Sequence, residues 1–482
     1  MFKTTNILPF IICNFITLYF FSQGLQLSFS EHVSYESNYK AISCINYNSK
    51  HVLIQSKKKS ENCDIKVNIF DSDLKNKNQF NFKIDNEKLV GVRLLYNNIV
   101  LFTSLNNGVE TILRARTLDI SSKFLSPKNI FLETNKSGYP SFFKLADAVF
   151  ETSFNILVEL PFQNGKNEDL KLLTLNSGLQ VVNEVYNKLE IKFESKRDNK
   201  LLISNKGKIF LLKKIWKRGN NFYLYRLGKE IIKEKEIKVS QRKIAALDYF
   251  FNSKDELVIS GFYSSQIRYN YEGFFLLKYD SDLELIHKNQ YALSENIIKS
   301  FKSSKEIKEK GFGLDKFMIT DFTLDENQNH YLIAEHLSNK SSKKESYWYS
   351  IGFIVIKFNK NGNYIWGCPV PKDQKDKNLN FIGTFSLNID NSTQYFFNEL
   401  SNSNSRKGIP AEYGILNYCG TKNITFSESG VFQEKPMTIN FPGKDSEKYA
   451  FIPKQLHPKN KESSYFLIIN EKATNLMIGL VK

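Results

Sequence analysis

The chain has 482 residues, of which 41% are hydrophobic and 14% aromatic, and its formal net charge is +17 at pH 7. This composition excludes a disordered protein, because length and apolar content suffice for a large core. The lysines are spread along the chain rather than clustered on one element, so the charge does not indicate a nucleic-acid partner. A polyanion partner of another kind is the alternative.

The first 24 residues predict a cleavable export signal. Lys3 precedes an uncharged apolar run from Ile7 to Phe21, and Ser22-Gln23-Gly24 places small residues at the −3 and −1 positions of a cleavage site. The alternative, a retained anchor, is disfavoured because the run is shorter than a span of about 20 residues and contains Pro9. We expect a mature chain that starts near Leu25, has no transmembrane span, and is secreted, periplasmic or at the cell surface.

Apolar-alternating runs then recur in groups of four. The plainest group reads IAALDYFF, LVISGFY, GFFLLKY and LELIHKN over Ile244–Asn289, and the same order returns from Phe317. A recurring unit of four strands is typical of a β-propeller. The sequence therefore predicts an all-β fold, a single propeller domain over residues 25–482. Its eight four-stranded blades begin near residues 41, 89, 144, 200, 244, 317, 381 and 449. Seven blades are the alternative, because the third and fourth units have the least regular first strands.

Individual strands and turns follow from the same pattern. The third unit is expected to begin with LADAVFE, near Lys144. In the seventh unit, EYGILNY is expected to be the third strand and ITFSESGVF the fourth. Asp71-Ser72-Asp73 and Asp280-Ser281-Asp282 are expected to form tight turns in which the carboxylates bond their own backbone. Calcium binding by these oxygens is the alternative.

The two ends of the chain are complementary. The eighth unit stops at Lys482 after three strands, whereas Leu25–Tyr35 is an alternating strand that precedes the first unit. An open ring would leave strand edges unpaired. We therefore expect Leu25–Tyr35 to complete the last blade by pairing with Leu476–Lys482. Frayed termini are the alternative.

The long insertions fall between particular strands. In a four-stranded blade, the first-to-second and third-to-fourth turns lie on one face of the disc, and these are expected to be short. The remaining connections lie on the opposite face, and they hold the long insertions, so this face is expected to carry function. The insertions are Ser264–Glu272, Ser294–Lys316, Ser338–Ser350, Pro371–Asn380 and Ser401–Ala411.

Export permits disulfides, and the mature chain contains four cysteines. Proximity in the sequence favours the pairs Cys44–Cys63 and Cys368–Cys419, whereas buried free thiols are the alternative. There is no CxxC motif or zinc-type spacing, and the six histidines show no metal spacing. We expect no metal and no cofactor.

Two units resemble the bacterial β-propeller repeat. The residues that carry the resemblance in the fifth unit are Asp248, Asn252, Gly261, Gly273, Lys278 and Asp280. In the sixth unit they are Asp321, Asp325, Lys357, Asn359, Gly362 and Trp366. The match covers Ile244–Val370, a quarter of the chain, and Asp282 stands where the repeat has a glycine. The resemblance implies a secreted propeller and no general catalytic residues.

No catalytic signature appears, because the chain lacks G-x-S-x-G, a P-loop and the motifs of known propeller enzymes. This favours a non-enzymatic binding or scaffold protein whose ligand is a cell-envelope protein, a polysaccharide or another polyanion. A glycan hydrolase or lyase with its active site at the central channel is the alternative, and its catalytic residues are unknown.

The candidate binding residues are cations and aromatics in the loops of blades five to seven, a combination that suits carbohydrate and polyanion surfaces. They are Arg268, Tyr269, Tyr271, Lys343, Lys344, Tyr347, Trp348, Tyr349, Arg406 and Lys407. Solvated loop lysines are the alternative. The sequence IIKSFKSSKEIKEK, within Ser294–Lys316, is expected to form a short amphipathic helix.

Overall fold

The computed structural model describes residues 27–34, 40–58, 62–135, 139–146, 153–161, 166–192, 197–216, 220–229, 231–240, 242–265, 270–341, 346–377, 379–389, 392–400, 418–435, 449–453, 464–470 and 475–481. Within these ranges the chain is mostly β-strand, with two short helices and one 3-10 turn. No helix in them has the length and hydropathy needed to cross a membrane.

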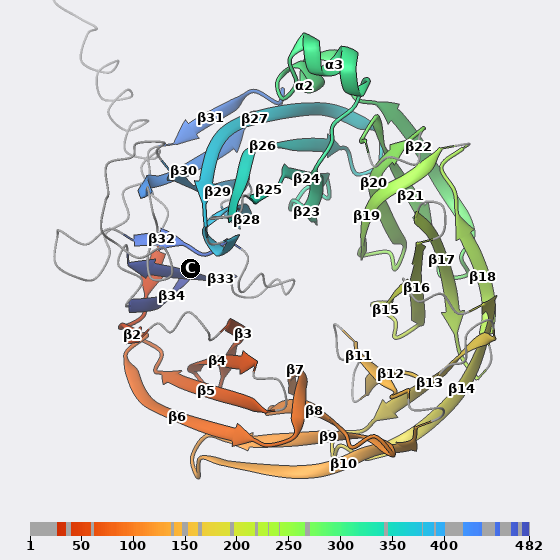
Figure 1. The fold of residues 1–482 in the computed structure, drawn as a ribbon, viewed down its shortest axis with the longest axis vertical. Helices are drawn as coiled ribbons and strands as arrows, with labels where there is room; N and C mark the ends of the chain where they lie inside the picture. The colour runs from red at the N-terminus through yellow and green to blue at the C-terminus, as the bar shows by residue number, and fades with distance from the viewer. Residues whose placement is uncertain are drawn as a thin grey trace, which may run out of the picture.

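The strands form eight sheets arranged around a ring (Figure 1). In six of the eight sheets the strands follow chain order from the centre of the ring to its rim, whereas blades six and eight, described below, depart from this order; neighbouring strands are antiparallel throughout. The predicted eight-bladed β-propeller is thus confirmed, and the seven-blade alternative is excluded.

Blades one to four contain four strands each. Blade one contains β3 (Lys40–Tyr47), β4 (Lys50–Lys58), β5 (Cys63–Phe70) and β6 (Asn76–Ile84). Blade two contains β7 (Glu87–Leu95), β8 (Asn98–Asn106), β9 (Glu110–Asp119) and β10 (Phe124–Thr134). Blade three contains β11 (Phe142–Leu145), β12 (Phe154–Glu159), β13 (Asn167–Leu175) and β14 (Val181–Lys192). Blade four contains β15 (Arg197–Ile203), β16 (Ile209–Trp216), β17 (Asn220–Leu227) and β18 (Ile231–Ile237).

Blades five to eight carry the larger insertions. Blade five contains β19 (Lys243–Phe251), β20 (Leu257–Ser264), β21 (Gly273–Tyr279) and β22 (Leu285–Ala292), and is followed by α2 (Glu295–Lys299) and α3 (Ser304–Lys310). Blade six contains β23 (Phe317–Leu324), β24 (His330–His336), β25 (Ser338–Ser341), β26 (Ser346–Phe358) and β27 (Tyr364–Asp376). After the 3-10 turn Leu379–Phe381, blade seven contains β28 (Thr384–Ile389), β29 (Ser392–Leu400), β30 (Tyr418–Phe426) and β31 (Phe432–Lys435). Blade eight contains β32 (Tyr449–Phe451), β33 (Ser464–Asn470) and β34 (Asn475–Val481).

The ring is closed by the N-terminal segment, as the sequence predicts. The strands β1 (Leu27–Phe29) and β2 (Val33–Ser34) both pair with β34. Between them, the backbone N–H of Ser30 donates to the carbonyl of Ile478 at 2.8 Å, and Ile478 N–H donates to Ser30 Oγ at 2.9 Å. The last blade therefore contains three strands from the C-terminus and a fourth position filled from the other end of the chain.

The second and third strands of a blade are sandwiched between neighbouring blades. Every residue of β20 and β21 is buried, which explains why LVISGFYS and GFFLLKY are nearly continuous apolar runs. Core clusters extend from one blade to the next; for example, Phe102 of blade two stacks on Phe154 of blade three, with ring centroids 5.5 Å apart. Packing between blades thus supplies the core of the ring.

One turn type recurs on one face of the disc. In this turn of five residues, the N–H of the first residue donates to the carbonyl of the fifth, and the N–H of the fourth donates to the carbonyl of the first. Such turns begin at Asp71, Asn176, Ser204, Asn252, Asp280, Asp325, Asn359 and Ser427. The fourth residue has a left-handed backbone, with φ of 62° at Leu74 and 91° at Gly362, as expected for a three-residue hairpin with a bulge. Asp71 and Asp280 each accept two N–H bonds from their own turn, so the predicted capping role is confirmed.

Two strand predictions are wrong. In blade three the first strand is β11, which ends at Leu145, where the expected strand LADAVFE begins. In blade seven ITF belongs to the third strand, β30, and Ser427–Gly430 is the recurring turn rather than part of a fourth strand. The apolar run EYGILNY outweighed that turn in the sequence, and all of it except Tyr418 lies outside the described residues.

The predicted disulfides are also wrong, because Cys44, Cys63 and Cys368 are free. Cys44 lies opposite Leu53 on the neighbouring strand, and Leu53 lies opposite Asn68 on β5. Cys63 is at the start of β5, about 16 Å along that strand from Asn68, since one residue spans about 3.3 Å. A disulfide needs Cα atoms within about 7 Å, so the register of blade one separates the two thiols too far.

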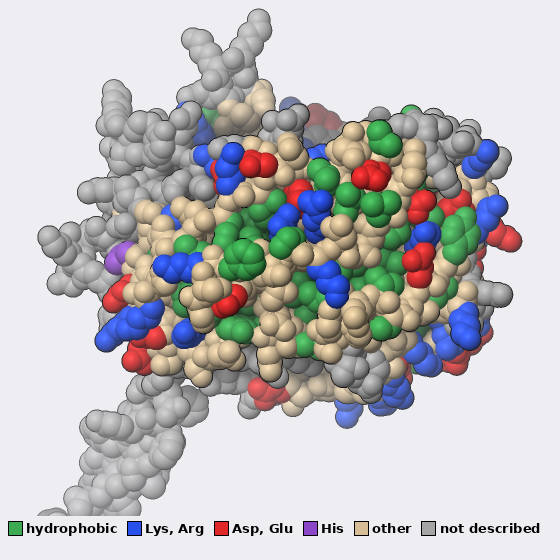
Figure 2. Space-filling model, turned by 90° about the horizontal axis from the view of Figure 1, so that it is seen from below, with side chains coloured by type: hydrophobic (Ala, Val, Ile, Leu, Met, Phe, Trp, Pro, Cys, Tyr) green, Lys and Arg blue, Asp and Glu red, His purple; other side chains and the backbone are tan. Residues whose placement is uncertain are grey.

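The two faces of the disc differ. We call the side with the recurring turns the turn face, and the opposite side, where second strands lead into third strands and blades lead into blades, the loop face. The first and second strands of blade three are separated by residues 146–153, and those of blade eight by residues 452–463, so the expectation that all first-to-second connections are short is wrong. The part of the rim that faces the viewer in Figure 2 carries apolar side chains among charges of both signs.

Candidate functional site

Blade six extends beyond its neighbours on the loop face. Its third and fourth strands, β26 and β27, have 13 residues each, whereas β21 and β22 of blade five have 7 and 8. The strand β25 pairs with the additional part of β26, which pairs with β27 on its other side. Figure 1 shows β26 and β27 as long arcs. The predicted loops Ser338–Ser350 and Pro371–Asn380 are therefore largely strands.

Tyrosines and lysines alternate across one side of this extension, a group we call the lysine–tyrosine ladder: Lys340, Tyr347, Tyr349, Lys375 and Lys377. The ring centroids of Tyr347 and Tyr349 are 6.5 Å apart. Lys375 Nζ lies 4.5 Å and 5.6 Å from these two centroids, Lys340 Nζ lies 5.1 Å from that of Tyr349, and Lys377 Nζ lies 5.4 Å from that of Tyr347. The rings hold three ammonium groups together by cation–π attraction.

Trp348 lies on the other side of β26, because successive strand residues point to opposite faces. Its side chain packs against a buried cluster that includes Phe381 and Ile452. The neighbouring strand shows the same alternation: Lys372, Gln374 and Asp376 are buried, whereas Asp373 is exposed. Of the three consecutive aromatics predicted for binding, Tyr347 and Tyr349 therefore belong to the ladder, and Trp348 anchors it.

The other predicted binding residues do not join the ladder. Tyr271 is 4% exposed and stacks on Phe262 at 4.4 Å between ring centroids, so its ring belongs to the core of blade five. Burial raises the pKa of its hydroxyl well above the usual range. The six remaining predicted residues lie outside the described residues: Arg268, Tyr269, Lys343, Lys344, Arg406 and Lys407.

The predicted amphipathic helix is two short helices, α2 and α3. Ile297 and Ile298 of α2 are buried, and Ser303 caps α3 in a capping box with Glu306. Lys299 pairs with Glu295 at 2.6 Å, and Lys302 pairs with Asp315 at 3.1 Å. The insertion therefore covers the core, and at least these two lysines are neutralised locally.

Buried ion pairs lie beneath the loop face. In blade six Lys372 Nζ donates to Glu335 Oε1 at 2.7 Å and to Thr384 Oγ1 of blade seven at 2.9 Å, and Ser350 Oγ donates to the same Glu335 oxygen at 3.0 Å. Thr384 N–H donates to Glu335 Oε2 at 2.9 Å. This network connects two blades directly below the ladder-bearing extension, so it fixes where the extension stands.

Two carboxylates meet between blades three and four. Asn199 Nδ2 donates to one oxygen of Glu159 at 3.1 Å and one of Glu168 at 2.8 Å, so these oxygens are at most about 6 Å apart. Arg197 pairs with both glutamates, and Lys213 pairs with Glu168. This upper limit lies below the roughly 6.5–9.5 Å separation of inverting glycoside hydrolases but permits the roughly 5–5.5 Å separation of retaining ones.

The pKa values of the two glutamates are shifted in opposite directions. Burial raises the pKa of Glu159, because Arg197 only partly offsets the desolvation. Burial alone would also raise the pKa of Glu168, but Lys213 and Arg197 outweigh it and lower the pKa. Glu159 is 6% exposed and Glu168 is 1% exposed. Their oxygens are occupied by Arg197, Asn199 and Lys213, so the arrangement holds blades together rather than presenting an acid and a base to a substrate.

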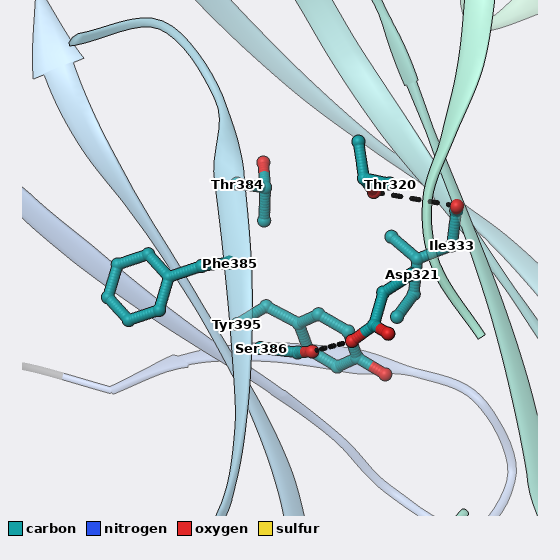
Figure 3. A pocket seen from close by; sticks show the side chains of 7 residues that line it. All are labelled: Thr320, Asp321, Ile333, Thr384, Phe385, Ser386 and Tyr395. Atoms are coloured by element: carbon teal, nitrogen blue, oxygen red, sulfur yellow. Dashed lines mark hydrogen bonds between the residues drawn. The ribbon is translucent and has the colours of Figure 1, made fainter. Parts of the chain in front are cut away.

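A shallow recess lies between the inner strands of blades six and seven (Figure 3). Ser386 Oγ donates to Asp321 Oδ2 across it, which connects β28 to β23. Tyr395 lies behind them; burial raises its pKa well above the usual range. The unfilled volume is about 180 Å³, open solvent included, below the roughly 300–1,000 Å³ of ligand pockets. Asp321 therefore serves here as a link between blades.

Metal ligands do not gather in the part of the chain that the structure describes: no group of three or more His, Cys, Asp or Glu there could hold an ion. The residues that sequence reasoning missed are Lys340, Lys375 and Lys377. The signal is the alternation of Lys375 and Lys377 at the end of β27, but it is hidden because the buried residues that alternate with them, Gln374 and Asp376, are polar.

The comparisons with known proteins give similar folds only. No family model matches the chain, and no curated protein matches it. A protein of unknown function from Bacteroides caccae is 9% identical, with a TM-score of 0.32, over 67% of this chain and 94% of its own. Prolyl oligopeptidase B from Galerina marginata is 8% identical, with a TM-score of 0.39, over 90% of this chain and 55% of its own. An α-L-arabinanase from Penicillium chrysogenum is 8% identical, with a TM-score of 0.32, over 56% of this chain and 99% of its own.

Proposed function

We propose that this chain is an exported β-propeller that binds an anionic partner at the cell envelope through the lysine–tyrosine ladder. The observation that carries the proposal is the ladder itself, in which three ammonium groups lie 4.5 to 5.6 Å from the centroids of two tyrosine rings. Cation–π contacts restrict the lysine side chains before binding, so less conformational entropy is lost when an anion arrives.

The position of the ladder supports binding rather than a structural role. The ladder lies on β26 and β27, which are longer than the corresponding strands of blade five. It is on the loop face, where the connections between strands hold the long insertions. Trp348 and the Lys372–Glu335 pair hold the base of the extension in place. Lys340 is exposed, and Lys375 and Lys377 are half-buried, so solvent reaches the cations while their stems are supported.

Export is part of the proposal because of the first 24 residues. The positive residue, the apolar run and the small residues that end at Gly24 have the order of a signal peptide. The resemblance of blades five and six to the bacterial β-propeller repeat agrees with an exported protein. N-terminal sequencing of protein recovered from the medium or envelope is expected to begin near Leu25; recovery of the intact chain from the cytoplasm would contradict export.

Reversing the ladder charges is expected to weaken polyanion binding selectively. The variant Lys340→Glu/Lys375→Glu/Lys377→Glu is expected to bind fluorescein-labelled poly-glutamate at least about tenfold more weakly than the unmodified chain at low salt, because charge complementarity becomes repulsion. Fluorescence anisotropy titrations measure this. The affinity of the unmodified chain is expected to fall as salt is raised.

The control must remove the same charge elsewhere, because the chain has a net charge of +17. Lys206, Lys254 and Lys360 are exposed residues of three recurring turns, on the turn face. Their triple replacement by glutamate makes an equal charge change and is expected to leave most of the binding intact. Equal losses in the two triple variants would show that binding reflects overall charge, and the proposed site would be rejected.

A further inference from the structure

The outer edge of β27 is a candidate strand-addition site. Among the described strands, β27 pairs only with β26, so its other edge faces the rim. Pro369 and Pro371 lack N–H groups and interrupt the first part of this edge. The stretch from Lys372 to Asp376 contains no proline. Edges of this kind accept an added strand through main-chain hydrogen bonds.

The side chains beside this edge form an ordered charge pattern. Asp373, Lys375 and Lys377 alternate with buried residues, so they lie on one side of the strand. Residues two apart on a strand are about 6.7 Å apart, which agrees with the 6.5 Å between the rings of Tyr347 and Tyr349. An extended peptide repeats its own side chains with the same period. A polysaccharide lacks the main-chain amides that the edge would engage.

We propose that the anionic partner is an extended peptide that adds to β27 in antiparallel orientation, with acidic residues opposite Lys377 and Lys375 and a basic residue opposite Asp373. Directly opposed residues of antiparallel strands have Cβ atoms about 4.5–5.5 Å apart, close enough for ion pairs. Read in the direction of the partner, the motif is acidic–x–acidic–x–basic. This inference rests on the proposed function, because it uses the same lysines.

The test uses the full chain and short labelled peptides. The peptide TVETETKVT has the motif, and TVTEEKTVT has the same composition with its charges adjacent. We expect the first to bind at least about tenfold more tightly, because only it places both acids on the lysine side. The charge-swapped peptide TVKTKTEVT is expected to bind a chain with Asp373→Lys, Lys375→Glu and Lys377→Glu, and not the unmodified chain. Equal midpoint temperatures of thermal unfolding for the unmodified chain and the variant would show that the variant folds.

Backbone methylation tests the mode of binding. In an added strand, alternate N–H groups point to the host, so N-methylation of one set of peptide residues is expected to abolish binding while methylation of the other set leaves it. Equal binding of the methylated sets, equal binding of the two charge orders, or failure of the charge swap would overturn strand addition. If poly-glutamate still binds the ladder in that case, the proposed function stands; if it does not, both proposals fail.

Discussion

Replacing Gly261 by alanine is expected to lower the free energy of unfolding by about 3 kcal/mol or more. Gly261 lies in β20, where β19 bulges between Ile244 and Ala246 and brings its backbone close. A Cβ at Gly261 would lie 2.8 Å from Cα of Leu247 and closer still to the carbonyl oxygen of Ala246. Neither atom belongs to a flexible side chain, so the strand pair itself must shift. Urea denaturation followed by tryptophan fluorescence measures the loss.

A second glycine provides the control. Gly178 lies in one of the recurring turns, and a Cβ there would meet nothing closer than 3.4 Å. Gly178→Ala is therefore expected to change the free energy of unfolding by no more than about 0.5 kcal/mol. A stable, fully folded Gly261→Ala variant would contradict the described pairing of β19 with β20.

The second large effect is expected at Lys213. This side chain is fully buried, donates to Glu168, and lies 3.3 Å from Asn199 Oδ1. Lys213→Met leaves a buried carboxylate without its closest cation, so we expect a loss of about 3–5 kcal/mol in the free energy of unfolding. Glu168→Gln, which leaves the ammonium unpaired, is expected to have a similar cost. The double variant is expected to cost less than the sum, because neither charge then remains buried alone.

An exposed ion pair provides the comparison for the buried Lys213–Glu168 pair. Lys299 and Glu295 of α2 are 2.6 Å apart, but their side chains are 54% and 64% exposed. Lys299→Met is expected to change stability by less than about 0.5 kcal/mol. If Lys213→Met were equally mild, or if its cost and that of Glu168→Gln were additive, the buried ion pair would not hold blades three and four together as described.

Much of the fold could be predicted from the sequence because its determinants are local. GFFLLKY coincides with β21, and the turn Asp280-Ser281-Asp282 has the hydrogen bonds expected of its residues. Closure could be predicted because a three-stranded last unit and a spare first strand are complementary. The failure at blade seven has a physical cause: Ser427 starts a turn through the same backbone bonds as Asp280, but serine signals a turn more weakly than aspartate.

The candidate site was harder to predict because it is built on polar strands. The inward side of the β27 extension is Lys372, Gln374 and Asp376, all buried and polar. Hydrophobic periodicity cannot detect a strand whose buried side carries charges and amides. The sequence therefore predicts a loop over Pro371–Asn380 and does not identify Lys375 and Lys377 as site residues. Which side Trp348 faces depends on the register of β25 and β26, which is a tertiary property.

Ring closure is the central claim, because the common loop face depends on it, and a cross-link tests it most directly. Ser28 lies opposite Leu480 in the β1–β34 pair, and opposed strand residues have Cα atoms within the range that a disulfide spans. After mild oxidation of the double variant Ser28→Cys/Leu480→Cys, peptide mass spectrometry is expected to find the two introduced cysteines linked within one chain. If the cysteine introduced in β1 stays reduced, or is linked instead to another cysteine or to a second molecule, the closed eight-bladed ring is contradicted.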